Sequence, residues 1–247
     1  MFLYILATLG VGIGGVFGTP FVVLADHGSF HNETITTAVT KAPGTYTWGN
    51  LTISTGGTLT LQGNCAANTG VTINANTITV ESGRSITANG QGCAGGVLGN
   101  AEGKTPSGQT GGGSSGNASR GGGGGGYGGN GGNGQNSVGS GPGSGLGGVS
   151  YGAAATAQPV FLGSGGGFGS NTGTGGSGGG SIKLNALDSL LVNGTISANG
   201  NSGSGGGGGN AGGGGGSGGS IWIATGALDG TGSITANGGG GGGGPTK

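Results

Sequence analysis

Two stretches in the second half of the 247-residue chain determine the expected fold. Residues 180–200 are GSIKLNALDSLLVNGTISANG, and residues 219–238 are GSIWIATGALDGTGSITANG. Two earlier stretches have similar length and pattern: residues 51–70 are LTISTGGTLTLQGNCAANTG, and residues 71–90 are VTINANTITVESGRSITANG. Three of the four end in Ser/Thr-Ile-Ser/Thr-Ala-Asn-Gly. A unit of about 20 residues that recurs with one closing signature predicts a repeat architecture in which successive units stack.

Within each unit apolar residues alternate with polar ones, and a period of two indicates β-strands. An opening strand points one set of side chains inward: Leu51 and Ile53, Val71 and Ile73, Ile182 and Leu184, and Ile221 and Ile223. Its other face carries Thr52, Thr72, Lys183 and Trp222. The inward residues of a middle strand are Leu59 and Leu61, then Ile78 and Val80, and those of a closing strand are Ile86, Ile196 and Ile234. Three short strands in about 20 residues predict an all-β fold, a parallel β-solenoid with one unit per coil.

The closing asparagines Asn89, Asn199 and Asn237 occupy equivalent positions in their units. Coils of a solenoid stack in register about 4.8 Å apart, so these residues are expected to form one column at a corner. Stacked asparagines hydrogen-bond along such a ladder, and asparagine also tolerates turn geometry. We therefore predict a structural role for this column rather than a ligand-binding one.

Glycine supplies 78 of the residues and is concentrated between the coils. Glycine-rich tracts follow each closing Asn-Gly: a long insert at 91–179, a short insert at 201–218 and a tail at 239–247. The rest of the chain divides into a leading segment at 1–25, an N-terminal cap region at 26–50, two coils at 51–90 and single coils at 180–200 and 219–238. Insertions at one repeat position emerge on one side of the stack. The inserts are therefore expected to form a lobe along one corner of the solenoid.

The sequence leaves the state of this lobe open between two alternatives. Isolated glycine runs lose much backbone entropy on ordering, which favours a disordered brush. Bare backbones can also pack closely as a polyglycine-II-like bundle, and residues 128–133 have the three-residue period of that helix. Apolar residues in the long insert favour packing, namely Tyr127, Leu146, Val149, Tyr151, Val160, Phe161, Leu162 and Phe168.

Charge and titratable residues limit the classes of function. Six acidic and six basic residues give a net charge of zero, which argues against nucleic-acid binding and against a polybasic membrane contact. Matches to the dinucleotide-binding pattern Gly-x-Gly-x-x-Gly arise here from composition alone. We expect Asp188 and Asp229, which lie near the same turn of their units, to serve turn geometry. A metal site formed by Asp26, His27 and His31 is an alternative hypothesis to a protein without bound metal. We expect a protein that is not an enzyme and that needs no cofactor.

Three features predict export. Residues 1–25 are uncharged and apolar or small, which is typical of a signal peptide or, if uncleaved, of a membrane anchor. Cys65 and Cys93 are the only cysteines, and a pair in an oxidising compartment predicts a disulfide. Candidate glycosylation sites occur at four Asn-x-Ser/Thr sequons, Asn32, Asn50, Asn117 and Asn193. The expected location is extracellular or at a cell surface.

The repeated Ile-x-Ala-Asn-Gly units and the glycine runs between about residues 45 and 244 resemble glycine-rich β-solenoid, adhesin-like surface proteins. The glycine tracts also look like the polyglycine-II sandwiches in the tip adhesins of some phage tail fibres. The resemblance implies extracellular display, recognition by loops or assembly into fibres, and it implies no catalytic residue.

Three functions are expected from these features, in decreasing weight. The first is a self-associating structural protein of a fibre or surface coat, because low charge and a bare last coil favour pairing through strand edges. The second is an adhesin or a receptor- or glycan-binding module with Tyr127, Tyr151 and Trp222 as candidate ligand contacts. The third is ice binding by threonine columns, in which Thr58-Leu59-Thr60 would stack on Thr77-Ile78-Thr79.

Overall fold

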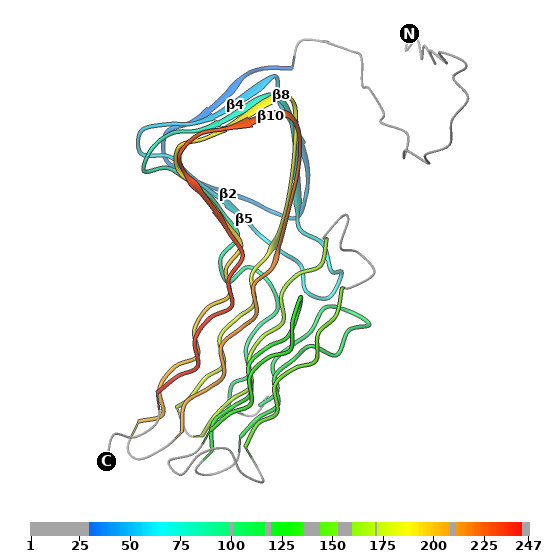
Figure 1. The fold of residues 1–247 in the computed structure, drawn as a ribbon, viewed down its shortest axis with the longest axis vertical. Coiled ribbons are helices and arrows are strands. Elements are labelled where there is room, and N and C mark those ends of the chain that lie inside the picture. The colour runs from blue at the N-terminus through cyan, green and yellow to red at the C-terminus, as the bar shows by residue number, and fades with distance from the viewer. Residues whose placement is uncertain are drawn as a thin grey trace, which may run out of the picture.

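The computed structural model describes residues 30–98, 101–116, 120–135, 144–152, 160–170, 172–207 and 211–243. These residues form a solenoid with a triangular cross-section and a glycine-rich lobe that extends from one corner of the triangle (Figure 1). In this part of the chain every regular element is a β-strand, and no apolar helix of membrane-spanning length occurs. The predicted leading segment at 1–25 lies outside the described residues, as does the sequon at Asn117.

Eleven strands of the described residues form two parallel sheets that wind as a three-sided coil. In chain order they are β1 (Glu33–Ile35), β2 (Ala38–Lys41), β3 (Gly44–Thr47), β4 (Asn50–Ile53), β5 (Thr58–Leu61), β6 (Val71–Val80), β7 (Ser85–Thr87), β8 (Ser181–Val192), β9 (Thr195–Ser197), β10 (Ser220–Asp229) and β11 (Ser233–Thr235). One sheet has the order β1-β4-β6-β8-β10, with β3 also paired to β6, and the other has the order β11-β9-β7-β5-β2. The predicted parallel β-solenoid is confirmed.

The three sides of the triangle follow from the strand pairing. Register shifts in β6 at Ala75/Thr77 and in β10 at Thr225/Ala227 divide the long strands at a corner. The first side consists of β3 and the opening halves of β6, β8 and β10, and the second side consists of β1, β4 and the closing halves. The third side is the second sheet, β2, β5, β7, β9 and β11. The glycine lobe leaves the corner between the third side and the first.

The core is a thin column of apolar side chains that run from coil to coil. On the third side Leu59 pairs with Ile86, and Ile86 pairs with Ile196, and all three are fully buried. Burial of one such side chain contributes about 1.5–3 kcal/mol, but only when a neighbouring coil covers it. The stack therefore depends on its neighbours for stability, as the repeat predicts.

In the first coil the predicted pairing of strands is wrong. Leu51 pairs with Ile78 on the second side rather than with Val71, and the opening half of β6 pairs instead with β3. The strands β1, β2 and β3 lie in the region that the sequence assigned to an N-terminal cap, so this region forms rungs of the solenoid. All three sides carry the same alternation of apolar and polar residues, and this pattern alone does not distinguish one side from another.

The closing asparagines form the predicted column, with a different bonding pattern. Asn199 donates its backbone N–H to Oδ1 of Asn89 at 2.7 Å, and Asn237 donates its N–H to Oδ1 of Asn199 at 2.7 Å. Each side-chain oxygen therefore accepts from the backbone of the next coil rather than from another side chain. A second asparagine pair, which the sequence analysis missed, joins Nδ2 of Asn185 to Oδ1 of Asn74 at 2.8 Å on the first side.

The glycine inserts form the predicted lobe, and the described part of this lobe is a packed bundle. Its extended segments lie side by side and hydrogen-bond to segments that are remote in sequence. Gly166, for example, donates its N–H to the carbonyl of Gly176 at 2.9 Å, and Gly122 donates to the carbonyl of Gly212 at 3.1 Å. These contacts favour the polyglycine-II alternative over the disordered brush.

Residues 163–168, here called the central segment, show how the bundle is ordered. Its backbone N–H groups donate to residues 176 and 179, to residues 101 and 104, and to residue 123, except that Ser164 donates to Oγ of Ser217. Its carbonyls accept from residues 93 and 96, from residues 113 and 116, and from residues 214 and 217. The partner segment changes with a period of three, and six segments surround the central one. Three residues per turn without internal hydrogen bonds is the geometry of a polyglycine-II helix, which allows hexagonal packing.

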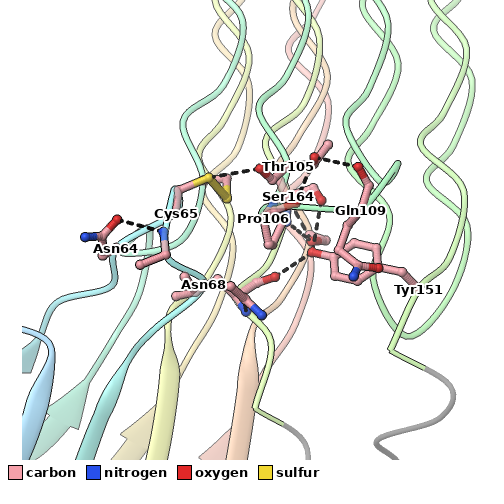
Figure 2. The surroundings of a disulfide bond; sticks show 12 residues. Asn64, Cys65, Asn68, Thr105, Pro106, Gln109, Tyr151 and Ser164 are labelled. Carbon is pink, nitrogen blue, oxygen red and sulfur yellow. Dashed lines mark hydrogen bonds between the residues drawn. A yellow bond between two sulfur atoms is a disulfide. The ribbon is translucent and has the colours of Figure 1, made fainter.

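The predicted disulfide between Cys65 and Cys93 ties the lobe to the solenoid (Figure 2). Cys65 belongs to the loop 62–70, which leaves the solenoid at the lobe corner, and Cys93 lies in the first segment of the lobe and is fully buried. Close to it, Oδ1 of Asn68 accepts the backbone N–H of Leu162 at 3.1 Å. Loop and lobe are therefore joined by a covalent bond and by a hydrogen bond.

Candidate functional site

The end of the solenoid formed by β10 and β11 exposes residues that are core elsewhere. Leu228 pairs with Leu190 and Ile234 pairs with Ile196. The inner partners are 0% exposed, whereas Leu228 is 57% exposed and Ile234 is 41% exposed. Ala236 is exposed as well, although the equivalent Ala198 is fully buried. Among the described residues nothing covers this apolar surface, which we call the open end.

The strand edges at the open end are also unpaired. β10 pairs only with β8, and β11 pairs only with β9. The outer N–H and C=O groups of a ten-residue strand and a three-residue strand therefore face outward. An exposed strand edge is a ready template for pairing with another chain. Apolar surface and unpaired backbone coincide at this end of the molecule.

At the opposite end of the solenoid aromatic side chains cover the core, although the outer edges of β1, β2 and β3 are unpaired there as well. Trp48 is buried, and Tyr46 stacks on it with ring centroids 5.9 Å apart. The ammonium of Lys41 lies 5.0 Å from the Tyr46 ring centroid and 5.5 Å from that of Trp48. A cation over aromatic faces is favourable and presents a polar group to solvent. The two ends of the stack therefore differ, and the open end is the candidate association surface.

The aromatic residues predicted as ligand contacts lie in two different environments. Trp222 lies on the outer face of the first side, where the ammonium of Lys183 is 3.7 Å from its ring centroid. Tyr151 is buried, its hydroxyl donates to the carbonyl of Leu162, and Oγ of Ser164 donates to the hydroxyl at 3.0 Å. A buried ring with a bonded hydroxyl has no free face for a sugar, so the structure gives Tyr151 a packing role.

Tyr127 and Tyr151 form a cluster at the junction of lobe and solenoid. Their ring centroids are 5.0 Å apart, and Phe161 packs edge-on against Tyr151 at 6.1 Å. Burial raises the pKa of Tyr127 above its ordinary value near 10, and contacts with Ser220 and the backbone of Phe161 offset part of that rise. Burial also raises the pKa of Tyr151, and by more. Both phenols are therefore held in their neutral form.

Two columns of hydroxyl residues run along the outward-pointing positions of the third side, and one member, Ser197, is buried. One column pairs Thr58, Ser85, Thr195 and Ser233, and the other pairs Thr40, Thr60, Thr87, Ser197 and Thr235. The predicted stacking of residues 58–60 on residues 77–79 is wrong, because residues 58–60 pair with residues 85–87. The loop 62–70 adds residues to the first unit, so strands that seem equivalent by residue count do not pair. The signal for the full columns was present in the closing signature, which has Ser or Thr at both outward positions.

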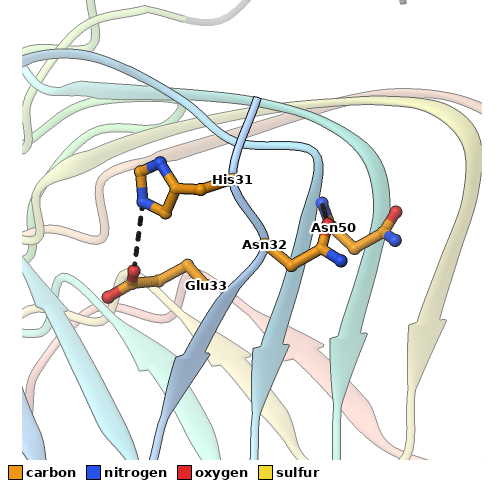
Figure 3. A network of polar contacts seen from close by, with 4 residues as sticks. All are labelled: His31, Asn32, Glu33 and Asn50. Carbon is orange, nitrogen blue, oxygen red and sulfur yellow. Dashed lines mark hydrogen bonds and ion pairs between the residues drawn. The ribbon is translucent and has the colours of Figure 1, made fainter. Parts of the chain in front are cut away.

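The acidic residues and histidines do not converge on one site. Asp229 pairs with Leu191, whereas Asp188 lies at the register shift opposite Gly226, so the two carboxylates do not lie in one column. Nε2 of His31 lies 3.4 Å from a carboxylate oxygen of Glu33 (Figure 3). The other members of the hypothetical terminal metal site, residues 26 and 27, lie outside the described residues. No group of three potential metal ligands occurs among the residues that the structure describes.

Three of the four sequon asparagines use their side-chain oxygens in hydrogen bonds. Oδ1 of Asn32 accepts the backbone N–H of Asn50 at 2.8 Å (Figure 3), and Oδ1 of Asn50 accepts from Oγ1 of Thr77 at 2.8 Å. Oδ1 of Asn193 accepts the N–H of Thr231 at 3.2 Å. A glycan attaches to the amide nitrogen, and these three hydrogen bonds do not use that atom. Glycosylation remains a prediction at these positions.

Comparisons with protein-family models, with curated proteins and with solved structures found no match for this chain.

Proposed function

We propose that this protein is a structural subunit of an extracellular fibre or surface coat, which self-associates through the open end of its solenoid. The observation that carries the proposal is the change along the core columns from full burial at Leu190 and Ile196 to exposure at Leu228 and Ile234. A second chain at this end would cover the apolar residues and pair the free edges of β10 and β11. The disulfide and the packed glycine lobe are consistent with a rigid protein displayed in an oxidising environment.

The test places a charge at the open end. Ile234→Lys should lower the tendency to associate at least tenfold in sedimentation velocity, because association would bury an unpaired ammonium. The matched control is Leu187→Lys, which changes an exposed leucine of β8, one coil inside the open end. If the unmodified protein stays monomeric at millimolar concentration, or if both variants behave alike, the open end is not an association surface.

A second candidate function rests on the hydroxyl columns of the third side. Parallel strands space hydroxyls regularly, about 4.8 Å between coils and about 6.6 Å along a strand, and such an array can order water at an ice surface. Thr60→Lys should then abolish inhibition of ice recrystallisation. Thr52→Lys, a substitution on the second side, should leave that activity intact, and equal behaviour of the two variants would reject the ice-binding candidate.

A further inference from the structure

Residues 211–219 form a glycine segment of the lobe that lacks one of six possible neighbours. The segment hydrogen-bonds to residues 121–125, 164–167, 176–179, 201–204 and 239–242. The central segment has six such neighbours, so the lattice around 211–219 has one unfilled position. That position is a groove of about 490 Å³ whose lining includes Gly125, Tyr127, Gly132, Gly215 and Gly238.

One wall of the groove presents unpaired hydrogen-bond donors. The backbone N–H groups of Gly212, Gly215 and Gly218 make no hydrogen bond with the described residues, although the other N–H groups of this segment alternate between two neighbours. All three glycines are buried. A buried N–H without an acceptor is rare in folded proteins and costs about 1–3 kcal/mol. These donors recur every third residue, as they do where the central segment meets a neighbour.

The adjacent wall presents unpaired acceptors with the same spacing. The carbonyls of Gly122 and Gly125 accept no hydrogen bond from the described residues, whereas those of Gly121 and Gly124 accept from the segment at 145–148. Three residues of polyglycine-II helix rise about 9 Å, so donors and acceptors are placed for one further helix of the same type.

The groove accepts backbone better than it accepts side chains. Its flanks are glycines, and a Cβ added at Gly132 would meet no atom within 4 Å, whereas one added at Gly238 would first meet a carbonyl at 3.6 Å. Interior glycines of the same lobe would clash with backbone at about 2 Å, for example Gly166 with Gly214 at 2.1 Å. The open space at Gly132 and Gly238 therefore corresponds to the missing helix.

We propose that this groove binds residues 238–243 of a second copy of the chain, as a polyglycine-II helix that fills the sixth position. This segment lies on the surface of the lobe and borders the groove. Its N–H groups at Gly238 and Gly241 and its carbonyls at Gly239 and Gly242 are unpaired among the described residues, again at intervals of three. They complement the free carbonyls and N–H groups of the groove.

The contact satisfies the geometry of a twofold axis. An axis between the two copies of 238–243 places each copy in the groove of the other, so each side presents the same surface. The groove also borders the open end, because Ala236 contributes to its lining. The lobe contact is nevertheless distinct from pairing of the strand edges, and each can be removed without the other.

The test uses the full chain and a variant that fills the groove. Gly238→Val should weaken dimerisation at least tenfold in sedimentation velocity, because its side chain enters the space of the missing helix. Gly207→Val is the matched control: a Cβ there first meets Oγ1 of Thr172 at 3.5 Å, and Gly207 belongs neither to the groove lining nor to residues 238–243. Hydrogen exchange followed by NMR reports the site directly, since the amides of Gly215 and Gly218 should become protected only as the dimer forms.

The outcomes separate this inference from the proposed function. If Ile234→Lys prevents association while Gly238→Val does not, strand edges associate and the groove proposal is wrong. If Gly238→Val alone prevents association, the groove is the contact and the strand edges are not. If the amides of Gly215 and Gly218 are already protected in the dilute monomer, the chain fills its own groove and the proposal fails.

Discussion

Gly166 lies at a point of the lobe where two backbones approach too closely for any side chain. A Cβ at this position would meet the carbonyl oxygen of Gly214 at 2.1 Å, and both partners are held by hydrogen bonds. We therefore expect Gly166→Ala to destabilise the lobe by about 3 kcal/mol, as overpacking of a rigid core does. Gly240→Ala, where the nearest atom is 3.7 Å away, should change stability by less than about 1 kcal/mol. Chemical denaturation measures both, and equal effects would contradict the packed bundle.

Asn199 is the middle residue of the asparagine column and both donates to and accepts from its neighbours in the column. Replacement by alanine removes the acceptor for the N–H of Asn237, so Asn199→Ala should lower the free energy of unfolding by about 1 kcal/mol. Asn199→Asp keeps an oxygen acceptor and should retain most of that stability. The comparison by urea denaturation isolates the hydrogen bond from turn preference, and equal losses in the two variants would assign the effect to turn geometry.

The loop 62–70 and the first lobe segment form the element that holds lobe and solenoid together. The disulfide between Cys65 and Cys93 closes a chain separation of 28 residues. Cross-linking a loop of this length stabilises a fold by about 3 kcal/mol through the entropy of the unfolded chain. The double variant Cys65→Ala, Cys93→Ala should therefore lower stability by about that amount, measured by denaturant unfolding under non-reducing conditions. Unchanged hydrogen exchange of residues 161–168 in this variant would mean that packing alone fixes the lobe.

The sequence predicts which residues form strands, but it does not predict which side of the solenoid each strand of the first coil occupies. Ile86, Ile196 and Ile234 share one closing signature, so their common column follows directly from the repeat. Leu51 is known from the sequence only as an apolar residue in an alternating run. Such runs occur on all three sides, so the pattern does not assign Leu51 to one of them. The loop 62–70 also adds residues at the corner, so counting back from the second coil assigns Leu51 to the wrong side.

The lobe illustrates a second limit of sequence analysis. A three-residue glycine period indicates the type of helix, and it gives no information on which helices become neighbours. The groove depends on the arrangement of segments 121–127, 211–219 and 238–243, which are far apart in the chain. Unpaired groups at Gly215 and Gly218 appear only when that arrangement is known. The open end, by contrast, was expected from the bare last coil.

At the scale of the whole molecule, the symmetry of association decides whether fibres can form. A twofold contact through the open end and the groove gives a closed pair, because both partners use the same surface. A fibre needs a second contact, and the free edges of β1, β2 and β3 at the opposite end are available for it among the described residues. Thr34→Pro in β1 should then leave the pair intact and shorten filaments seen by electron microscopy, because proline removes a donor from that edge. Filaments of unchanged length would show that fibre growth does not use this edge.

The junction between lobe and solenoid makes the stability of the whole molecule depend on alkaline pH. Burial raises the pKa of Tyr127 and of Tyr151 in the folded protein, whereas in the unfolded chain both ionise near pH 10. Above that pH the unfolded state loses protons that the folded state retains, so stability is full below about pH 10 and falls as the pH rises further. Each tyrosine contributes a slope of up to about 1.4 kcal/mol per pH unit.

Tyr151→Phe should therefore reduce that slope, measured as the free energy of urea unfolding between pH 9 and pH 11.5, even though it lowers stability at neutral pH by removing two hydrogen bonds. Phe161→Leu is the matched change, because it disturbs the packing of the same cluster and removes no ionisable group. It should lower stability equally at all these pH values. If the two variants have the same slope as the unmodified protein, Tyr151 does not ionise on unfolding in this range and the junction is not the origin of alkaline sensitivity.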